Sequence, residues 1–330
     1  MKYYTKQIIQ GLVAAVTLIA AVMLSSPPSV RAQDYPSRDI TFIVPYAPGG
    51  STDPICRQFA SQLEKVLGGN VIIENKPGAS ATIGTSAVVR AKPDGYTIGL
   101  GINSTLAYQP LVNKGLPYKT ADDYQLIIRM VDVPTILALR ADAPWKTFED
   151  FMVDVKKKPG KIRASVSGLR TGPDLVMQEF NKVAGVKIAT IPFTGGAAEA
   201  LLALLGGRVE AYVSSGTGVV GHVQAGKVRV LAVFKKGKYD LFPEATPVGD
   251  AGYNVTLQGT YYVIAPKGLP KHVQDKLVAA SLQVVRSEEF NKFCRANGLV
   301  VNVKGPESLK DELSWYGTMY SDLIKFIEQK

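Results

Sequence analysis

The order of apolar and polar positions predicts a strand, a tight turn and an amphipathic helix close together near the start of the chain. Residues 41–44 form a β-rich apolar run, and a turn containing prolines and two glycines follows it. Asp53 is expected to cap the helix, with Pro54 at the first helical position, where its missing N–H costs nothing. Apolar residues then recur at helical spacing until Gly68, which is expected to end the helix.

Strands and helices alternate along most of the remaining chain, which predicts an α/β fold with parallel strands. A second α/β unit follows the first, and in it Thr147 is expected to cap a helix that ends at Lys158. Two further β-like runs, 136–140 and 260–265, flank this unit and are predicted to connect the two halves. The other strands are expected at residues 71–74, 96–101, 162–166, 186–191, 209–213 and 228–233.

The chain from residue 271 onward is predicted to be mostly helical, because apolar residues recur there at helical spacing. These helices are expected to pack back onto the first half. A chain that leaves one half, builds another and returns predicts two lobes joined by two crossover segments. The expected segments are a signal peptide at 1–32, the first lobe at 33–135, the second lobe at 136–254 and a return to the first lobe at 255–330.

The first 32 residues have the composition of a secretory signal peptide. Lys2 and Lys6 precede an apolar stretch at residues 8–24, and residues 30–32 are typical of a cleavage site. An uncleaved membrane anchor is the alternative, although small residues and prolines before the site favour cleavage. Cleavage would remove three cations and no acid, which lowers the formal net charge from +10 to +7.

Composition argues against several classes of function. Basic residues form no long block interleaved with aromatic residues, so a nucleic acid is not an expected partner. The sequence contains only two histidines and two cysteines, and these form no recognisable metal-ligand set or catalytic motif. No cofactor or metal is therefore expected, and a secreted α/β enzyme is a less favoured alternative. Cys56 and Cys294 either form a disulfide or, for Cys56, fill a small space in the core.

The turn after the first strand is expected to hold an anion. Free N–H groups at residues 49–52, the hydroxyls of Ser51 and Thr52, and the positive end of the helix dipole would converge on one point. A carboxylate fits better than a nucleotide phosphate, because the turn lacks the spacing and the lysine of a phosphate loop. The alternative is a structural turn whose glycines only permit positive φ.

Short motifs follow one another in a specific order along the chain after residue 34. They are YPSR at 35–38, VPYAPGGSTD at 44–53, ENKPGA at 74–79, KPDGYT at 92–97, IPFTGG at 191–196, LGGRV at 205–209 and AGKVR at 225–229. This series resembles the Bug family, the periplasmic solute-binding proteins of tripartite tricarboxylate transporters. The resemblance implies a type II-like Venus-flytrap protein, expected to be monomeric, that closes on a small carboxylate and delivers it to membrane permease subunits.

The resemblance also implies which loops grip the solute, largely through main-chain amides, hydroxyls and bridging waters. The expected ligand-binding residues are Tyr46, Ala47, Gly49, Gly50, Ser51, Thr52 and Asn103 in the first lobe, and Ser167, Arg170, Thr171, Phe193, Gly195, Ser214 and Ser215 in the second. Arg170 departs from the family pattern, and its fork geometry suits a second carboxylate on the solute. The alternative is that Arg170 pairs with Asp174 or points to solvent.

The identity of the solute stays open at this point. A dicarboxylate, a tricarboxylate, an acidic amino acid and an aromatic acid all fit a site that grips one carboxylate. Tyr46 and Phe193 favour an aromatic acid if they face each other across the site, whereas both rings would otherwise pack as core. A sensor kinase that reads the closed form is the alternative to a permease as the membrane partner.

Overall fold

The computed structural model describes residues 35–329. The chain divides into two units, Met1–Ser37 and Arg38–Lys330, and both lobes described below belong to the second unit. The predicted signal peptide at 1–32 lies outside the described residues. Within residues 35–329, no helix is both long enough and apolar enough to span a membrane.

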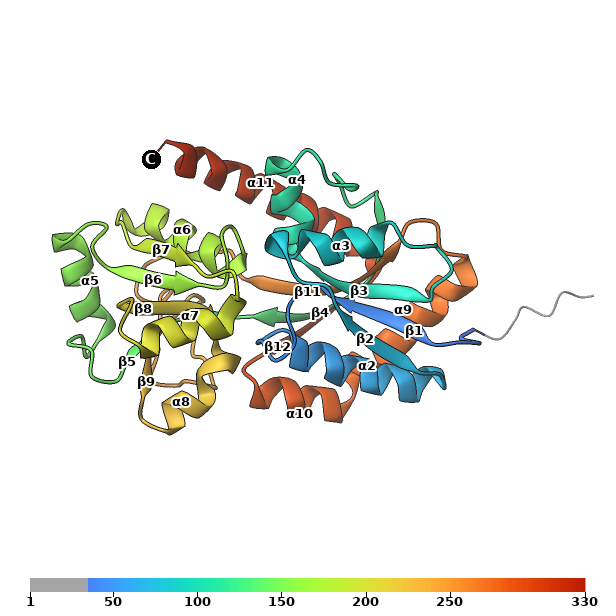
Figure 1. Ribbon diagram of the computed structural model, residues 1–330, viewed down its shortest axis with the longest axis horizontal. Coiled ribbons are helices and arrows are strands. Elements are labelled where there is room, and N and C mark those ends of the chain that lie inside the picture. The colour runs from blue at the N-terminus through green and yellow to red at the C-terminus, as the bar shows by residue number, and fades with distance from the viewer. Residues whose placement is uncertain (1–34, 330) are drawn as a thin grey trace, which may run out of the picture. The chain divides into compact units, whose positions relative to one another are not determined.

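The first lobe is built on a six-stranded sheet in the order β12-β4-β11-β3-β1-β2 (Figure 1). Its strands are β1 (Ile40–Val44), β2 (Val71–Asn75), β3 (Thr97–Ile102), β4 (Tyr124–Val133), β11 (Gly259–Pro266) and β12 (Val300–Lys304). Strand β1 is parallel to β2 and β3, whereas β11 is antiparallel to β3 and β4, and β12 is antiparallel to β4.

The second lobe has its own six-stranded sheet in the order β10-β9-β5-β8-β6-β7. Its strands are β5 (Thr135–Arg140), β6 (Arg163–Val166), β7 (Ala189–Pro192), β8 (Ala211–Ser215), β9 (Val228–Val233) and β10 (Thr246–Pro247). Strand β6 is parallel to β7 and β8, but β5 is antiparallel to β8 and β9. The expected parallel pairing is confirmed for β1 with β2 and β3 and for β6 with β7 and β8. Both sheets are nevertheless mixed, because β5 and β11, which enter from the other lobe, and β12 run against their neighbours.

Helices cover the sheets of both lobes (Figure 1). Those of the first lobe are α2 (Asp53–Leu67), α3 (Thr82–Val89), α4 (Gln109–Val112), α9 (Lys271–Arg286), α10 (Glu288–Ala296) and α11 (Leu309–Glu328). Those of the second are α5 (Phe148–Lys157), α6 (Gly172–Ala184), α7 (Gly196–Leu205) and α8 (Val220–Gln224). Short turns of other helix types are η1 (Ala79–Ala81), η2 (Ser104–Tyr108), η3 (Gly216–Val219) and η4 (Pro306–Ser308).

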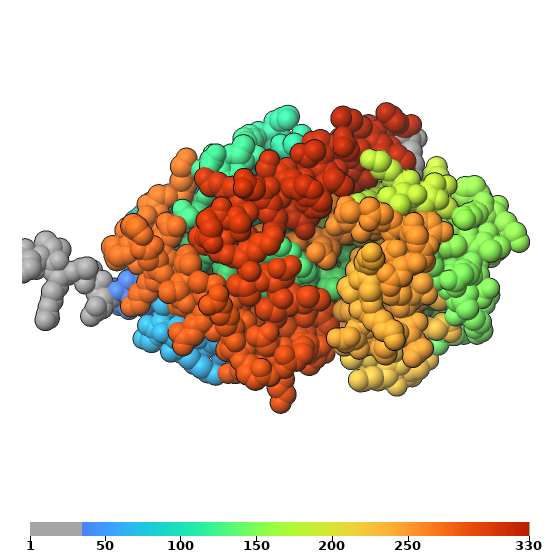
Figure 2. All heavy atoms as spheres, turned by 180° about the vertical axis from the view of Figure 1, so that it is seen from behind, coloured from blue at the N-terminus to red at the C-terminus, as the bar shows by residue number. Residues whose placement is uncertain are grey.

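The C-terminal helices pack mainly on the first lobe, as the sequence predicted. Helices α9 and α10 contact α2, and α11 contacts η2. Helix α11 also contacts α6 of the second lobe, and Figure 2 shows its red atoms reaching the yellow-green atoms of that lobe. The last helix therefore spans both lobes rather than covering the first one alone.

Two crossings join the lobes. The first runs from β4 to β5 through Pro134, and the second runs from β10 to β11 through residues 248–258. A Cβ at Gly259 would lie 3.2 Å from the Cβ of Val133, so a larger residue would push the two crossings apart by a few tenths of an ångström. The β-like runs 136–140 and 260–265 are confirmed as strands, β5 and β11, and they begin just after each crossing rather than forming the crossings themselves.

Glu179 of α6 holds the second crossing in place. Its carboxylate accepts hydrogen bonds from the N–H of Leu257 at 2.8 Å and from the hydroxyl of Thr256 at 2.7 Å. Burial raises the pKa of Glu179, and the hydrogen bonds from the crossing offset part of that rise. The contact ties the second lobe to the segment that must bend if the lobes move.

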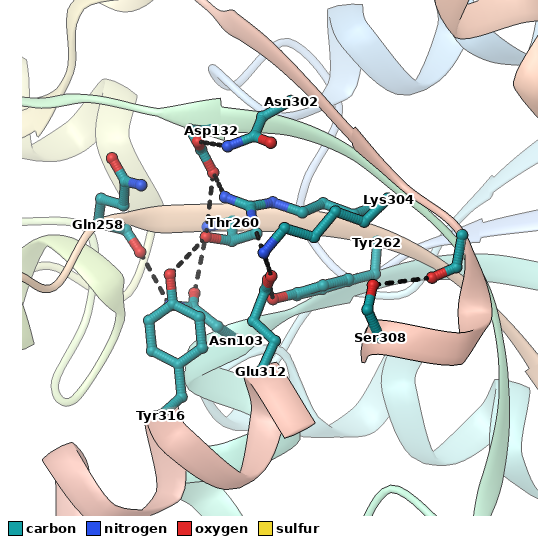
Figure 3. A network of polar contacts seen from close by, with 12 residues as sticks. Asn103, Asp132, Gln258, Thr260, Tyr262, Asn302, Lys304, Ser308, Glu312 and Tyr316 are labelled. Atoms are coloured by element: carbon teal, nitrogen blue, oxygen red, sulfur yellow. Dashed lines mark hydrogen bonds and ion pairs between the residues drawn. The ribbon is translucent and has the colours of Figure 1, made fainter. Parts of the chain in front are cut away.

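A buried polar network ties α11 to the strands beside the crossings (Figure 3). The Arg129 side chain, only 6% exposed, donates to Glu312 at 2.8 Å and pairs with Asp132. The hydroxyls of Thr260 in β11 and Tyr316 in α11 lie 2.8 Å apart. Helix α11 is thus attached to β4 and β11, the strands that border the two crossings.

Candidate solute-binding site

A cavity lies between the lobes and is lined by residues of both. It contains about 780 Å³ of empty space, including its opening to solvent. Among the described residues, those that line it include no aspartate, glutamate, lysine, arginine or histidine. The lining residues are Tyr46, Ala47, Pro48, Gly50, Ser51, Thr52, Ile102, Val133, Thr135, Ser167, Gly172, Pro173, Gly195, Gly196, Ala197, Ala198, Ser214, Ser215, Gly259 and Tyr261.

Three helices begin at this cavity. The residues that line it include Thr52 just before α2, Gly172 at the start of α6 and Gly196 at the start of α7. N–H groups in the first turn of a helix have no acceptor within the helix, and the helix dipole places positive potential there. The cavity is therefore suited to an anion although its described lining is uncharged.

Asp53 braces the first-lobe loop. Its carboxylate accepts from the N–H of Gly49 at 3.4 Å, from Nε of Arg57 at 2.7 Å and from the Asn75 amide at 2.8 Å. Burial raises the pKa of Asp53, but the hydrogen bonds from Arg57 and Asn75 outweigh it and hold the pKa below its usual range. Two expectations are corrected here: the N-cap is Thr52 rather than Asp53, and the Gly49 amide is not free.

Some polar groups of the first-lobe loop are hydrogen-bonded within the protein, and others remain to bind a solute. Thr52 shares a hydrogen bond of 2.9 Å with the hydroxyl of Tyr261, so it is already engaged. The described residues offer no hydrogen-bond partner to the amides of Gly50 and Ser51. Burial raises the pKa of Tyr46 to about 12, which keeps its hydroxyl protonated and able to donate. Gly50, Ser51 and Tyr46 are thus the donors that a solute finds in this lobe.

The second-lobe loops are held by similar contacts. The Arg170 N–H donates to Asp174 at 2.7 Å, and the Thr171 hydroxyl donates to the carbonyl of Gly168 at 2.9 Å. At the next loop, the Gly195 N–H donates to Glu199 at 2.7 Å. These bonds fix the loops from which α6 and α7 begin, and they leave amides in the first turn of each helix for a solute.

The structure brings most of the predicted ligand-binding residues to one cavity. Those that line it are Tyr46, Ala47, Gly50, Ser51, Thr52, Ser167, Gly195, Ser214 and Ser215. The predicted residues that do not line it are Gly49, Asn103, Arg170, Thr171 and Phe193. The role of each in binding stays a prediction.

Two of the residues outside the cavity have structural contacts of their own. The Asn103 side chain donates to the carbonyl of Gln258 at 2.8 Å and accepts from the N–H of Thr260 at 3.3 Å. The Phe193 ring packs on the second-lobe core, with the Arg208 guanidinium 5.5 Å from its centre. Phe193 therefore does not face Tyr46 across the cavity.

Sequence reasoning missed the residues at the floor of the cavity. Val133, Thr135 and Gly259 lie at the crossings, and Tyr261 follows in β11. They belong to strands rather than to loops after parallel strands, which is where sequence reasoning searches for ligand contacts. The glycine just before the β-like run at 260–265 is the one local signal from which a close backbone approach could have been predicted.

The two cysteines have no part in the site. Cys56 and Cys294 are both free and buried, so the disulfide alternative was wrong. Burial raises the pKa of the Cys56 thiol, and that of Cys294 to about 12, which leaves both unreactive. Within residues 35–329, no three histidine, cysteine or acidic side chains are placed to hold a metal ion.

Two α/β lobes joined by two crossings around an anion-suited cavity define a two-lobed solute-binding protein. The family model described as tripartite tricarboxylate transporter family receptor matches residues 55–309. Protein BugT of Bordetella pertussis strain Tohama I is 30% identical over 308 residues, which cover 91% of this chain and 94% of BugT. The chain belongs to the tripartite tricarboxylate transporter receptor family, as its motifs predicted.

Solved structures agree with this assignment. The periplasmic binding protein BugD is 30% identical, with a TM-score of 0.79 over 88% of this chain and 98% of BugD. Rpa4515 of R. palustris, solved with adipate, is 25% identical, with a TM-score of 0.82 over 88% of this chain and 98% of Rpa4515. The family consists of periplasmic solute-binding receptors, so this protein is a binding protein and not an enzyme.

Proposed function

We propose that this protein binds a small carboxylate between its lobes in the periplasm and delivers it to the permease subunits of a tripartite transporter. The observation that carries the proposal is the convergence of three helix N-termini, from both lobes, on a cavity whose described lining residues are all uncharged. The adipate in the related Rpa4515 structure supports a carboxylate as the solute.

The carboxylate would be held by neutral donors. The amides of Gly50 and Ser51 and the Ser51 hydroxyl supply the first-lobe contacts, and Ser167 and Ser214 line the cavity from the second lobe. Hydrogen bonds to a charged group contribute about 1.5–3 kcal/mol each. Four or five of them therefore sustain the roughly −8 kcal/mol of micromolar affinity after ordering costs.

Solute binding would favour closure of the lobes. Val133, Thr135 and Gly259 form the floor of the cavity at the two crossings, so a bend there changes the distance between its walls. A solute that contacts both lobes gains all its hydrogen bonds only in the closed arrangement. The permease would then recognise a surface that exists only in the loaded state.

Thermal unfolding against a panel of acids tests the proposal. The protein is unfolded, dialysed to remove any solute, refolded and mixed with adipate, malate, citrate, glutamate or benzoate. An acid present at about 100 times its Kd should add about 2.7 kcal/mol to the free energy of unfolding. Stabilisation by a sugar or a metal ion, with none from any acid, contradicts the proposal.

Delivery is tested separately from binding. Membrane vesicles that contain the permease subunits are supplied with labelled solute, with and without the purified protein. We expect uptake only when the protein is present. Binding without support of uptake would limit the proposal to solute capture.

A further inference from the structure

A second cavity lies beside the first, under the start of α7. It contains about 660 Å³ of empty space, including its opening. Gly50, Ser51, Ala197 and Ala198 belong to the linings of both cavities. The two cavities are therefore neighbours, and the four residues that they share carry no side chain or a very small one.

The second cavity is apolar along one wall. Leu201, Leu202 and Leu205 of α7 line it, and Leu202 is 63% exposed. Contact between an exposed leucine side chain and water is unfavourable, and a ligand that covers the side chain removes this contact. Apolar walls with a few polar groups are also typical of small-molecule sites. Apart from the polar residues that it shares with the first cavity, its polar groups come from Tyr212 and His222.

The Tyr212 hydroxyl is the polar end of this cavity. Tyr212 is 0% exposed, and the Ser214 side chain is close enough to act on its hydroxyl as a hydrogen-bond partner, although the contact falls short of normal hydrogen-bond geometry. A Cβ at Gly218, which lines the same cavity, would lie 3.7 Å from that oxygen. Buried hydroxyls are almost always well hydrogen-bonded, so this one, which has only the poorly aligned contact with Ser214, can accept a better partner from a ligand.

We infer that the second cavity receives the apolar end of the solute. The inference rests on the proposed function, with the carboxylate held among the helix N-termini of the first cavity. The solute class is then a monocarboxylate with an aromatic or other compact apolar body and a neutral hydrogen-bonding group that reaches Tyr212. The three leucines of α7 in its lining make the second cavity better suited to an apolar group than to a second carboxylate.

Isothermal titration with two matched acids tests the inference. The probes are 3-phenylpropanoate and 3-(4-hydroxyphenyl)propanoate, with adipate as the reference acid. Gly218→Leu places a side chain in the second cavity only, and we expect it to weaken both aryl acids by about tenfold or more. Adipate affinity should stay within about twofold, because Gly218 does not line the first cavity.

Gly221→Leu is the matched control. Gly221 lies three residues along and lines neither cavity, and a Cβ added to it would meet no atom within 4 Å apart from its neighbours along its own helix. We expect the substitution to leave the affinity for all three acids unchanged. If Gly218→Leu fails to fold by thermal unfolding, Leu202→Ser takes its place, since an exposed position tolerates the change, and it should weaken the aryl acids severalfold.

Tyr212→Phe tests the polar end. The wild type should bind the hydroxylated acid more tightly than the plain one, and Tyr212→Phe should remove that difference without weakening 3-phenylpropanoate. Equal losses for adipate and the aryl acids in Gly218→Leu, or adipate binding with no aryl binding, overturn the inference and leave the proposed function standing. Failure of every carboxylate to bind overturns the proposed function itself.

Discussion

Three carboxylates perform the same task at the three helices that begin at the cavity. Each lies in the first turn or so of its helix and accepts the backbone N–H of the residue four positions earlier in the loop. The pairs are Gly49–Asp53, Arg170–Asp174 and Gly195–Glu199. Each pair fixes its loop with one amide, so the donors nearby are held in place before binding, although the Gly196 N–H after the third pair already donates to the carbonyl of Phe193 at 3.2 Å.

Asp53→Asn should lower the free energy of unfolding by about 1.5–3 kcal/mol near neutral pH, because it removes charge-assisted hydrogen bonds. Hydrogen bonds hold the pKa of Asp53 below its usual range despite burial. The stabilisation is therefore complete above the unfolded pKa of about 3.9 and is lost as pH falls through the lower folded pKa. Urea unfolding between about pH 7 and pH 2 should show a flatter pH dependence in the variant.

The control is Asp275→Asn, which affects an exposed pair with Lys271. We expect it to change the free energy of unfolding by less than about 1 kcal/mol, since exposed ion pairs contribute little. An equal effect of both substitutions would mean that Asp53 acts only as one more surface charge.

Arg170 remains a predicted contact for a second carboxylate. Its backbone is held in the left-handed region at φ 57° and its N–H by Asp174, but its side chain does not line the cavity. If lobe closure brings the guanidinium to the solute, Arg170→Ala should weaken a dicarboxylate such as adipate and spare a monocarboxylate. Titration of both acids measures this, and unchanged adipate affinity means that Arg170 does not bind the solute.

At the level of elements, the sequence predicted the helices and strands that have a regular local pattern of residues. The capping box of Thr147 and Asp150 starts α5, and Gly68 ends α2 with φ 71°, both at the expected positions. Strand β4 was missed because it is buried on both faces and so shows no alternation. It also carries Arg129 and Asp132, which resemble surface residues in the sequence although their charges are paired inside the fold.

The same limit explains which part of the site the sequence predicted. Ser51 and Gly195 lie in turns with glycine and hydroxyl residues before helices, a local pattern that can be read along the chain. Thr135 and Gly259 reach the cavity only because two distant strands cross between the lobes. No local pattern encodes that meeting, so the floor of the cavity requires the tertiary structure.

Glu312→Gln should destabilise the protein by about 3–5 kcal/mol, because it leaves the buried Arg129 guanidinium with less compensation. Glu312 also pairs with Lys304 and accepts from the Tyr262 hydroxyl at 2.6 Å, so its loss loosens α11 from β4, β11 and β12 (Figure 3). Denaturant unfolding measures the change in free energy.

The matched control breaks an exposed pair on the same helix. Lys310→Met removes the ion pair between Lys310 of α11 and Asp122, and both of these side chains are well exposed. The free energy of unfolding should change little, because exposed ion pairs contribute little to stability. A small effect of Glu312→Gln, equal to the control, would show that the buried network does not hold α11.

At the scale of the whole molecule, the two lobes are joined by direct hydrogen bonds between residues that do not line the solute cavity. The Ser80 hydroxyl donates to the carbonyl of Leu169 at 2.8 Å, joining the first lobe to the second. The Tyr239 hydroxyl donates to the carbonyl of Gly298 at 2.8 Å and again joins the two lobes. These bonds stabilise the arrangement in which both lobes line the cavity, so they act together with the solute.

Ser80→Ala should shift the lobes toward a more open arrangement and weaken solute binding by about two- to tenfold, because one net hydrogen bond contributes about 0.5–1.5 kcal/mol. The loss should appear as faster dissociation, since the cavity residues are unchanged. Stopped-flow binding of adipate, with small-angle scattering before and after addition, measures both effects. Ser321→Ala, which removes a bond to Gly317 within α11, is the control and should change neither. Equal dissociation rates and equal scattering for the two variants would mean that the Ser80 bond does not contribute to closure.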